Sequence, residues 1–166
     1  MVAIAWRHWY ALLALGTYEM TMPKIERSAL LPYAADDLFE LVNQVEDYPQ
    51  YMSGCVGVDV LSRSEDHLEA RLHLSRAGVK QSFTTRNQLI KPTKMVMTLV
   101  DGPFKQFSGE WTFLPLNETA SKVNLNLEFE MNSGILQAAA SKLFEYTANE
   151  MLDALVKRAN ERLGKS

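Results

Sequence analysis

The chain has 166 residues, of which 47% are hydrophobic, and it carries a formal net charge of −3 with an isoelectric point near 5.6. This length allows one domain with a sizeable core but not two, and the charge excludes a global basic surface for nucleic acid. The single cysteine, Cys55, excludes an internal disulfide and multi-cysteine metal sites, and it indicates a reducing compartment, the cytoplasm.

The N-terminal 21 residues differ in composition from the rest of the chain. Residues 2–16 are apolar and aromatic, but polar residues interrupt them, and the longest apolar run is too short to span a membrane. Because Met20 and Met22 directly precede a well-patterned strand, we expect residues 1–21 to be an N-terminal extension of non-native sequence upstream of the true start, and residues 22–166 to form the domain. A signal or anchor sequence and a docking segment are the alternatives.

The first elements of the domain are a strand and two helical segments. Residues 24–31 mix apolar and charged side chains as a short strand, which Pro32 ends. Asp36 then lies in the first turn of an amphipathic helix, where negative charge suits the helix dipole. Pro49 cannot continue that helix, so a separate helical turn carrying aromatic residues follows.

Between residues 54 and 131 apolar and polar residues alternate in runs that Gly, Pro and Asn separate. This pattern predicts six consecutive strands and hence an antiparallel meander. The expected strands are residues 55–63, 67–76, 79–90, 94–100, 106–114 and 120–131. Two predicted faces are Val56, Val58 and Val60 in the first of these strands, and Phe83, Thr85, Asn87 and Leu89 in the third.

The last predicted strand passes directly into a helix over about residues 135–163. Its apolar stripe comprises Leu136, Ala140, Leu143, Phe144, Thr147, Met151 and Leu155. We therefore predict an α+β fold in which a curved antiparallel sheet of about seven strands wraps around a long C-terminal helix, in the order strand, two helices, six strands, helix. The concave side of such a sheet can hold an apolar ligand.

Several stretches of the chain resemble the RatA-type subfamily of the coenzyme Q-binding START-like proteins, which are polyketide cyclase-like. They are VKQSFTTRNQL over residues 79–89, LVDGPFK over 99–105, WTFLPL over 111–116, MPKIERS over 22–28 and DYPQY over 47–51. The resemblance covers essentially residues 22–166. The chain departs from the family after Tyr51, where members usually have a proline two residues later and this chain has Ser53.

The resemblance implies a helix-grip, START/Bet v 1-like fold in which two small helices close one end of the sheet. It also implies one of two functions. Members bind hydrophobic ligands, notably ubiquinone in mitochondrial relatives, where they support respiration as quinone chaperones. Bacterial RatA-type members are toxins that bind the large ribosomal subunit and block its association with the small one.

The chain offers little for catalysis. No metalloprotease, nucleophile-elbow, P-loop or dinucleotide motif is present, so we predict a protein that is not an enzyme and needs no cofactor. His67 and His73 share a strand face, but no further ligand at metal-binding spacing joins them, and we predict no metal site. Cys55 has no identifiable activating partner, which favours a small buried residue over a nucleophile.

Residues 101–105 allow two interpretations. In the structural one, Gly102 and Pro103 make a tight connection between strands and Asp101 accepts amide hydrogen bonds within it. In the functional one, Phe104 is a hydrophobic tip at the mouth of the cavity, and Lys105 reaches a polar headgroup, a partner or a membrane surface.

Aromatic and methionine side chains in such a fold are mostly core, but those beside an imperfectly closed sheet can accept an apolar guest. A quinone ring would stack on Trp111 or Phe129, and its tail would follow the C-terminal helix. The predicted ligand-binding residues are Phe39, Tyr51, Phe83, Met97, Phe104, Trp111, Phe129, Leu136, Leu143 and Met151.

The leading functional hypothesis from the sequence is a cytoplasmic, non-enzymatic carrier or chaperone of ubiquinone that supports respiration and touches the inner membrane transiently. The alternative is a RatA-type toxin on the large ribosomal subunit; no DNA partner is expected. Basic residues that would serve the alternative are Arg76, Lys80, Arg86, Lys91, Lys94 and Lys105. A cyclase or dehydratase using the same cavity is a third class, although the sequence shows no acid–base pair for it.

Overall fold

The computed structural model describes residues 24–132 and 134–164, without the side chains of residues 135–137. The predicted extension and the start of the predicted domain lie outside the described residues, so the domain boundary stays a prediction. The elements are β1 (Lys24–Leu31), α1 (Ala35–Asn43), η1 (Val45–Asp47), α2 (Tyr48–Tyr51), β2 (Cys55–Arg63), β3 (His67–Arg76), β4 (Val79–Ile90), β5 (Lys94–Asp101), β6 (Phe104–Asn117), β7 (Ala120–Met131) and α3 (Ile135–Leu163).

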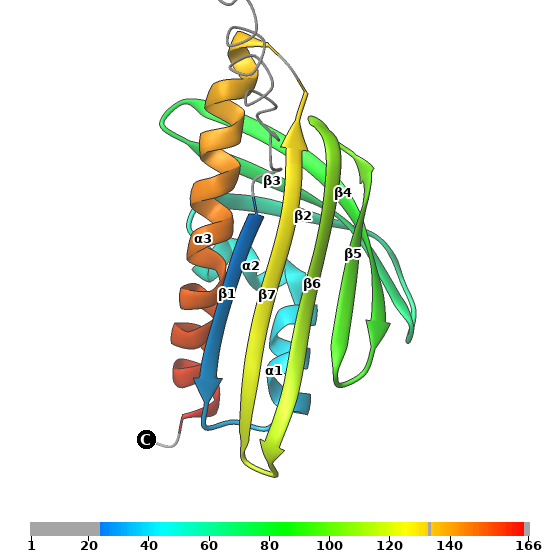
Figure 1. Ribbon diagram of the computed structural model, residues 1–166, viewed down its shortest axis with the longest axis vertical. Helices are drawn as coiled ribbons and strands as arrows, with labels where there is room; N and C mark the ends of the chain where they lie inside the picture. The colour runs from blue at the N-terminus through cyan, green and yellow to red at the C-terminus, as the bar shows by residue number, and fades with distance from the viewer. Residues whose placement is uncertain (1–23, 133, 165–166) are drawn as a thin grey trace, which may run out of the picture.

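The seven strands form one antiparallel sheet in the order β1-β7-β6-β5-β4-β3-β2. Consecutive strands pair as a meander, and β1 closes the order by pairing with β7, with Ile25 opposite Leu127. Figure 1 shows α3 running beside β1, and α1 and α2 behind β6 and β7. The sheet therefore curves around its helices, and the predicted helix-grip fold is confirmed.

Strict alternation of apolar and polar residues explains why β7 forms a strand at the centre of this arrangement. Val123, Leu125, Leu127 and Phe129 are buried, and the polar residues between them face away from the core. Burying each such side chain contributes roughly 1.5–3 kcal/mol, which is enough to fix the register because a slip of one residue would expose all four.

One predicted face and two predicted boundaries differ from the structure. A bulge between Cys55 and Gly57 turns Val56 outward, where it is 60% exposed, so Val56 does not share the face of Val58 and Val60. In addition, β6 is longer at both ends than the predicted 106–114, and β5 extends to Asp101. Pairing with β7 extends β6, and propensity alone gives no sign of such tertiary support.

The long helix α3 buries one stripe against the sheet, as its periodicity predicts. Its buried residues include Ala140, Leu143, Phe144, Thr147, Ala148, Leu152, Leu155 and Ala159. At the far edge, the Arg27 guanidinium of β1 donates to both carboxylate oxygens of Asp153 at 3.0 Å, and the Tyr33 hydroxyl donates to Asn160 at 2.7 Å. These contacts fix the helix beside β1. No helix within the described residues is long and apolar enough to cross a membrane.

Candidate functional site

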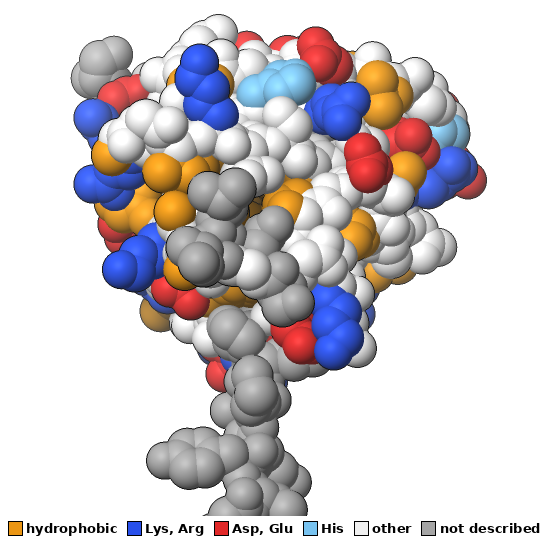
Figure 2. All heavy atoms as spheres, turned by 90° about the horizontal axis from the view of Figure 1, so that it is seen from above, with side chains coloured by type: hydrophobic (Ala, Val, Ile, Leu, Met, Phe, Trp, Pro, Cys, Tyr) orange, Lys and Arg blue, Asp and Glu red, His pale blue; other side chains and the backbone are white. Residues whose placement is uncertain are grey.

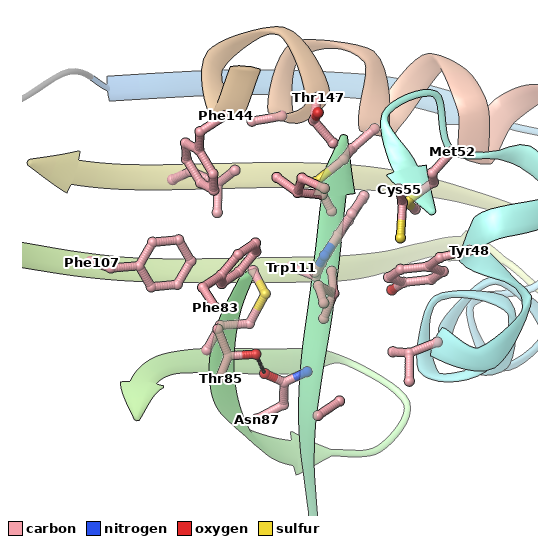
Figure 3. Close-up of a pocket in the computed structure, with 18 of the residues that line it drawn as sticks. Tyr48, Met52, Cys55, Phe83, Thr85, Asn87, Phe107, Trp111, Phe144 and Thr147 are labelled. Carbon is pink, nitrogen blue, oxygen red and sulfur yellow. Dashed lines mark hydrogen bonds between the residues drawn. The ribbon is translucent and has the colours of Figure 1, made fainter. Parts of the chain in front are cut away.

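A mostly enclosed cavity lies between the concave face of the sheet, α2 and α3 (Figure 3). The space between its lining atoms is about 670 Å³, the part open to solvent included, and about 50 Å³ of it admits the centre of a water molecule. The lining residues are Val45, Tyr48, Met52, Cys55, Ala70, Leu72, Leu74, Phe83, Thr85, Asn87, Met95, Met97, Phe107, Trp111, Leu127, Phe144, Thr147, Ala148 and Met151. An apolar guest fits the chemistry of this lining, but a large one must displace side chains.

Aromatic rings from β4, β6 and α3 form one end of the cavity. Phe83, Phe107 and Phe144 line it, with ring centroids 5.7–6.0 Å apart. Phe104 and Phe129 lie behind them, at 4.8 and 4.5 Å from Phe144. These rings meet edge to face or tilted, the geometry that aromatic pairs prefer, so this end of the cavity is well packed.

The opposite end, formed by α2 and β2, holds titratable groups that stay neutral. The Tyr48 hydroxyl donates a hydrogen bond to the Val42 carbonyl, and burial raises its pKa well above the usual value. Burial also raises the pKa of the Cys55 thiol, which contacts the Gly57 carbonyl at 3.7 Å. A neutral, buried thiol is a poor nucleophile, which supports the interpretation of Cys55 as a packing residue.

Three polar side chains interrupt the apolar lining. Thr147 of α3 donates to the Leu143 carbonyl one turn earlier, at 3.0 Å, and this bond satisfies its hydroxyl proton. Across the cavity, the Thr85 hydroxyl donates to Asn87 Oδ1 at 3.1 Å (Figure 3). No charged side chain is among the described residues that line the cavity.

Four of the predicted ligand-binding residues line the cavity: Phe83, Met97, Trp111 and Met151. Five others, Phe39, Tyr51, Phe104, Phe129 and Leu143, pack in the core or against it without lining the cavity. The side chain of Leu136 lies outside the described residues. Ligand contact by any of them stays a prediction.

Thr85 and Asn87 are polar residues on a strand face that the sequence predicts to be apolar and buried. Their parity on β4 places them on the same inward face as Phe83 and Leu89, and both are buried. Polar residues on an otherwise apolar face mark a buried polar site, because a strand that only packs in the core would carry apolar residues there. The inward face of Thr85 and Asn87 was predicted correctly, but the buried polar site was not predicted.

The segment of residues 101–105 is structural. A Cβ at Gly102, whose φ is +152°, would lie 2.7 Å from Phe83 Cβ, so only glycine fits there. Phe104 is 6% exposed, and the hypothesis of a hydrophobic tip is therefore wrong. Lys105 pairs with Glu130 at 3.2 Å. Asp101 accepts from the Arg71 side chain at 3.2 Å, and no backbone amide of the described residues donates to its carboxylate, so the predicted amide hydrogen bonds of Asp101 are not found.

The segment between α2 and β2 lies tightly against α3. Gly54 has φ +87°, and a Cβ there would stand 2.6 Å from Thr147 Oγ1. Beside it, the Ser53 and Tyr146 hydroxyls lie 3.2 Å apart, and the Arg76 guanidinium stacks 3.3 Å from the centroid of the Tyr146 ring. These contacts hold the segment after Tyr51 against α3, beside Thr147, which lines the cavity.

His67 and His73, both on β3, contact serine and carboxylate side chains on the outer face of the sheet. His67 contacts two serine hydroxyls at 2.8 and 2.6 Å, and His73 lies between Ser82 and Asp59 at 2.7 Å from each. Within residues 24–132 and 134–164, no three side chains of the types that ligate metals come together.

The basic residues proposed for a ribosome contact do not form one patch. Arg76 and Lys80 flank the β3–β4 hairpin, whereas Lys91 and Lys94 lie at the other end of β4. Four of the six face acidic partners, in the pairs Arg86–Glu69, Lys91–Glu40, Lys94–Glu110 and Lys105–Glu130. Figure 2, which looks down on the end where α3 begins, shows Lys and Arg side chains spread around its rim, with hydrophobic side chains between them.

Known proteins are similar to this chain in both sequence and fold. The family described as polyketide cyclase / dehydrase and lipid transport matches residues 31–156. The chain is 43% identical over 143 residues to the ribosome association toxin RatA of Vibrio cholerae, covering 86% of this chain and 99% of the relative. It is 24% identical over 161 residues to the mitochondrial coenzyme Q-binding protein COQ10 of Dictyostelium discoideum, covering 92% and 78%.

Among solved structures, the aromatase/cyclase Zhui from a Streptomyces species superposes with a TM-score of 0.74 at 19% identity, covering 86% of this chain and 96% of that one. At this identity the likeness shows the fold alone.

Proposed function

The chain belongs to the polyketide cyclase / dehydrase and lipid transport family, in its RatA-type group, and we propose that it binds the large ribosomal subunit and blocks association with the small one. The observation that carries this proposal is the 43% identity across nearly the whole length of a ribosome association toxin. The proposed activity is cytoplasmic. The ubiquinone hypothesis has weaker support, because the coenzyme Q-binding relative is only 24% identical.

The surface that supports this proposal best is the β3–β4 hairpin. Lys80 is exposed, and no acidic side chain pairs with it among the described residues. Arg76 stacks on Tyr146 without a carboxylate partner in that part of the chain. Basic groups not neutralised by neighbours are the ones available to phosphates of ribosomal RNA.

Sucrose-gradient sedimentation tests the proposal. Added to purified subunits, the full chain is expected to travel with the large subunit and to reduce joined ribosomes. Its binding should weaken steeply with salt, and Lys80→Glu should weaken binding and lower the salt slope by about one or two. The matched control is Lys91→Glu, at the far end of β4. No co-sedimentation at low salt, or binding independent of salt, would refute the proposal.

A second function is favoured by the cavity itself. We propose that it holds an apolar ligand, with ubiquinone as the candidate that the coenzyme Q-binding relative suggests. Flexible methionines, Met97 and Met151, line the walls and can rotate to widen a space that is narrow when empty. Each buried methylene of a tail would contribute about 0.8 kcal/mol.

Organic extraction of the purified protein, followed by mass spectrometry, tests this second function. A quinone or another lipid in stoichiometric amount supports it. An extract without any apolar compound, from protein that also fails to take up a short-chain quinone, contradicts it. Contact with a membrane surface stays a prediction.

The proposal that the protein is not an enzyme rests on the lining of the cavity. General acid–base chemistry needs a titratable group within hydrogen-bond reach of the substrate. The titratable lining groups, Tyr48 and Cys55, both have pKa values raised by burial, so neither supplies the anion that a general base needs near neutral pH. Because fold neighbours include a cyclase, the fold alone does not decide this question.

A further inference from the structure

One buried amide in the cavity has hydrogen-bonding capacity that the protein leaves unused. Asn87 is 5% exposed and lines the cavity on β4. Its oxygen, Oδ1, accepts from the Thr85 hydroxyl at 3.1 Å. Among the described residues, the partner of its nitrogen, Nδ2, is the Met95 sulfur at 3.7 Å. A thioether is a weak acceptor, and an amide nitrogen carries two protons, so Asn87 retains a donor without a strong partner.

The orientation of the amide is fixed by its neighbours. In the reverse orientation, Oδ1 would face the Met95 sulfur, which has no proton to donate, and the contact would be lost. The Met95 sulfur, which only accepts, therefore sets the orientation, and the Thr85 hydroxyl, which is itself 4% exposed, donates to the Oδ1 that faces it. A buried donor without a full partner is destabilising, and such groups are retained where a ligand or water completes them.

We infer that the side-chain amide of Asn87 donates a hydrogen bond to the polar end of the cavity ligand. This ligand is an apolar molecule carrying an acceptor oxygen such as a ketone or quinone carbonyl. The inference rests on the proposed binding of an apolar ligand and adds the chemistry that the cavity selects. Figure 3 places Thr85 and Asn87 together on one wall, away from Phe107 and from Phe144, so the carbonyl lies at this wall and the apolar part extends toward the aromatic rings.

A matched pair of probes isolates the hydrogen bond. Acetophenone and α-methylstyrene have the same shape, with a carbonyl oxygen in the first replaced by a methylene in the second. Dissociation constants are measured by NMR titration of the ¹⁵N-labelled full chain. In the unmodified protein, acetophenone is expected to move the Asn87 side-chain amide proton further downfield than α-methylstyrene does, because the two phenyl rings exert the same ring-current shift and only acetophenone accepts a hydrogen bond.

The variant Asn87→Leu removes the donor and keeps a side chain of similar size. The ratio of the two dissociation constants should move about fivefold toward the hydrocarbon, the effect of one net hydrogen bond. Using a ratio cancels the difference in hydrophobicity between the probes. Thr85→Val should move the ratio in the same direction by less, and Thr84→Val, on the same strand but outside the cavity lining, should leave it unchanged.

The outcomes separate this inference from the function on which it rests. Binding of both probes with an unchanged ratio in Asn87→Leu overturns the role of Asn87 and leaves apolar binding standing. Failure of both probes to bind the unmodified chain overturns both. The amide signal in the unmodified protein decides the matter even if a variant does not fold.

Discussion

Filling the cavity is the most direct check that it is empty space rather than packed core. Ala70 lies on β3, is 1% exposed and lines the cavity, so Ala70→Val adds two methyl groups into it from a strand that favours β-branched residues. Eliminating about 50 Å³ of cavity at about 24 cal/mol per Å³ gives at most ~1.2 kcal/mol of stabilisation. For a domain of this size that is an increase of about 3 °C in Tm.

The assay is urea unfolding followed by circular dichroism, together with NMR titration of a small apolar probe. Ala70→Val should raise the free energy of unfolding and weaken probe binding at the same time. The control is Ala120→Val, the same substitution in β7 at a half-buried position that does not line the cavity. Destabilisation of Ala70→Val by more than about 1 kcal/mol would mean overpacking, and it would refute the existence of usable space beside β3.

Three further predictions concern the walls of the cavity. Phe144→Leu should cost about 1.5 kcal/mol in urea unfolding, since it removes aromatic contacts and keeps most of the volume; a cost below ~0.5 kcal/mol would contradict a packed aromatic end. Gly54→Ala should lower the free energy of unfolding by more than about 2 kcal/mol, because its Cβ meets Thr147. The control Gly78→Ala has φ +79° and open space around it, so it should lower that free energy by only about 1 kcal/mol. Equal losses in the two variants would argue against close packing at Gly54. Because burial raises the folded-state pKa of Cys55 above its ordinary 9.0, its contribution to stability is present below pH 9 and is lost as pH rises through the folded pKa. Urea unfolding at pH 8 and pH 10 should therefore show a smaller loss in Cys55→Ala than in the parent, and identical losses would contradict the burial effect.

Period-two patterning was sufficient to predict the strands, because each has one face that must be buried. β2, β3, β4 and β7 begin and end where alternation predicts. The bulge at Val56 could not be predicted, since it depends on how β2 follows the curvature of β3 rather than on the residues of β2 alone.

The cavity was harder to predict than the fold for a physical reason. Parity shows which side chains point inward, but a cavity is the space that they fail to fill, and this depends on volumes contributed by several elements at once. Phe104 and Trp111 both face inward and are both buried, yet only Trp111 borders the cavity. Asn87 is different, because a polar residue on a buried face is visible in the sequence itself.

The two proposed functions use different parts of the molecule, and this allows them to be separated. The cavity lies on the concave face of the sheet, while Lys80 lies beside the turn that joins β3 to β4, at the end of these strands. Ala70→Val changes the cavity and leaves the hairpin surface in place, whereas Lys80→Glu changes the hairpin surface and leaves the cavity in place. If Ala70→Val also changes binding to the ribosomal subunit, the ligand must act on the surface through the wall that joins them, where Arg76 of the same hairpin stacks on Tyr146 of α3. If each variant affects only its own assay, the apolar ligand and the ribosome are independent partners of one fold.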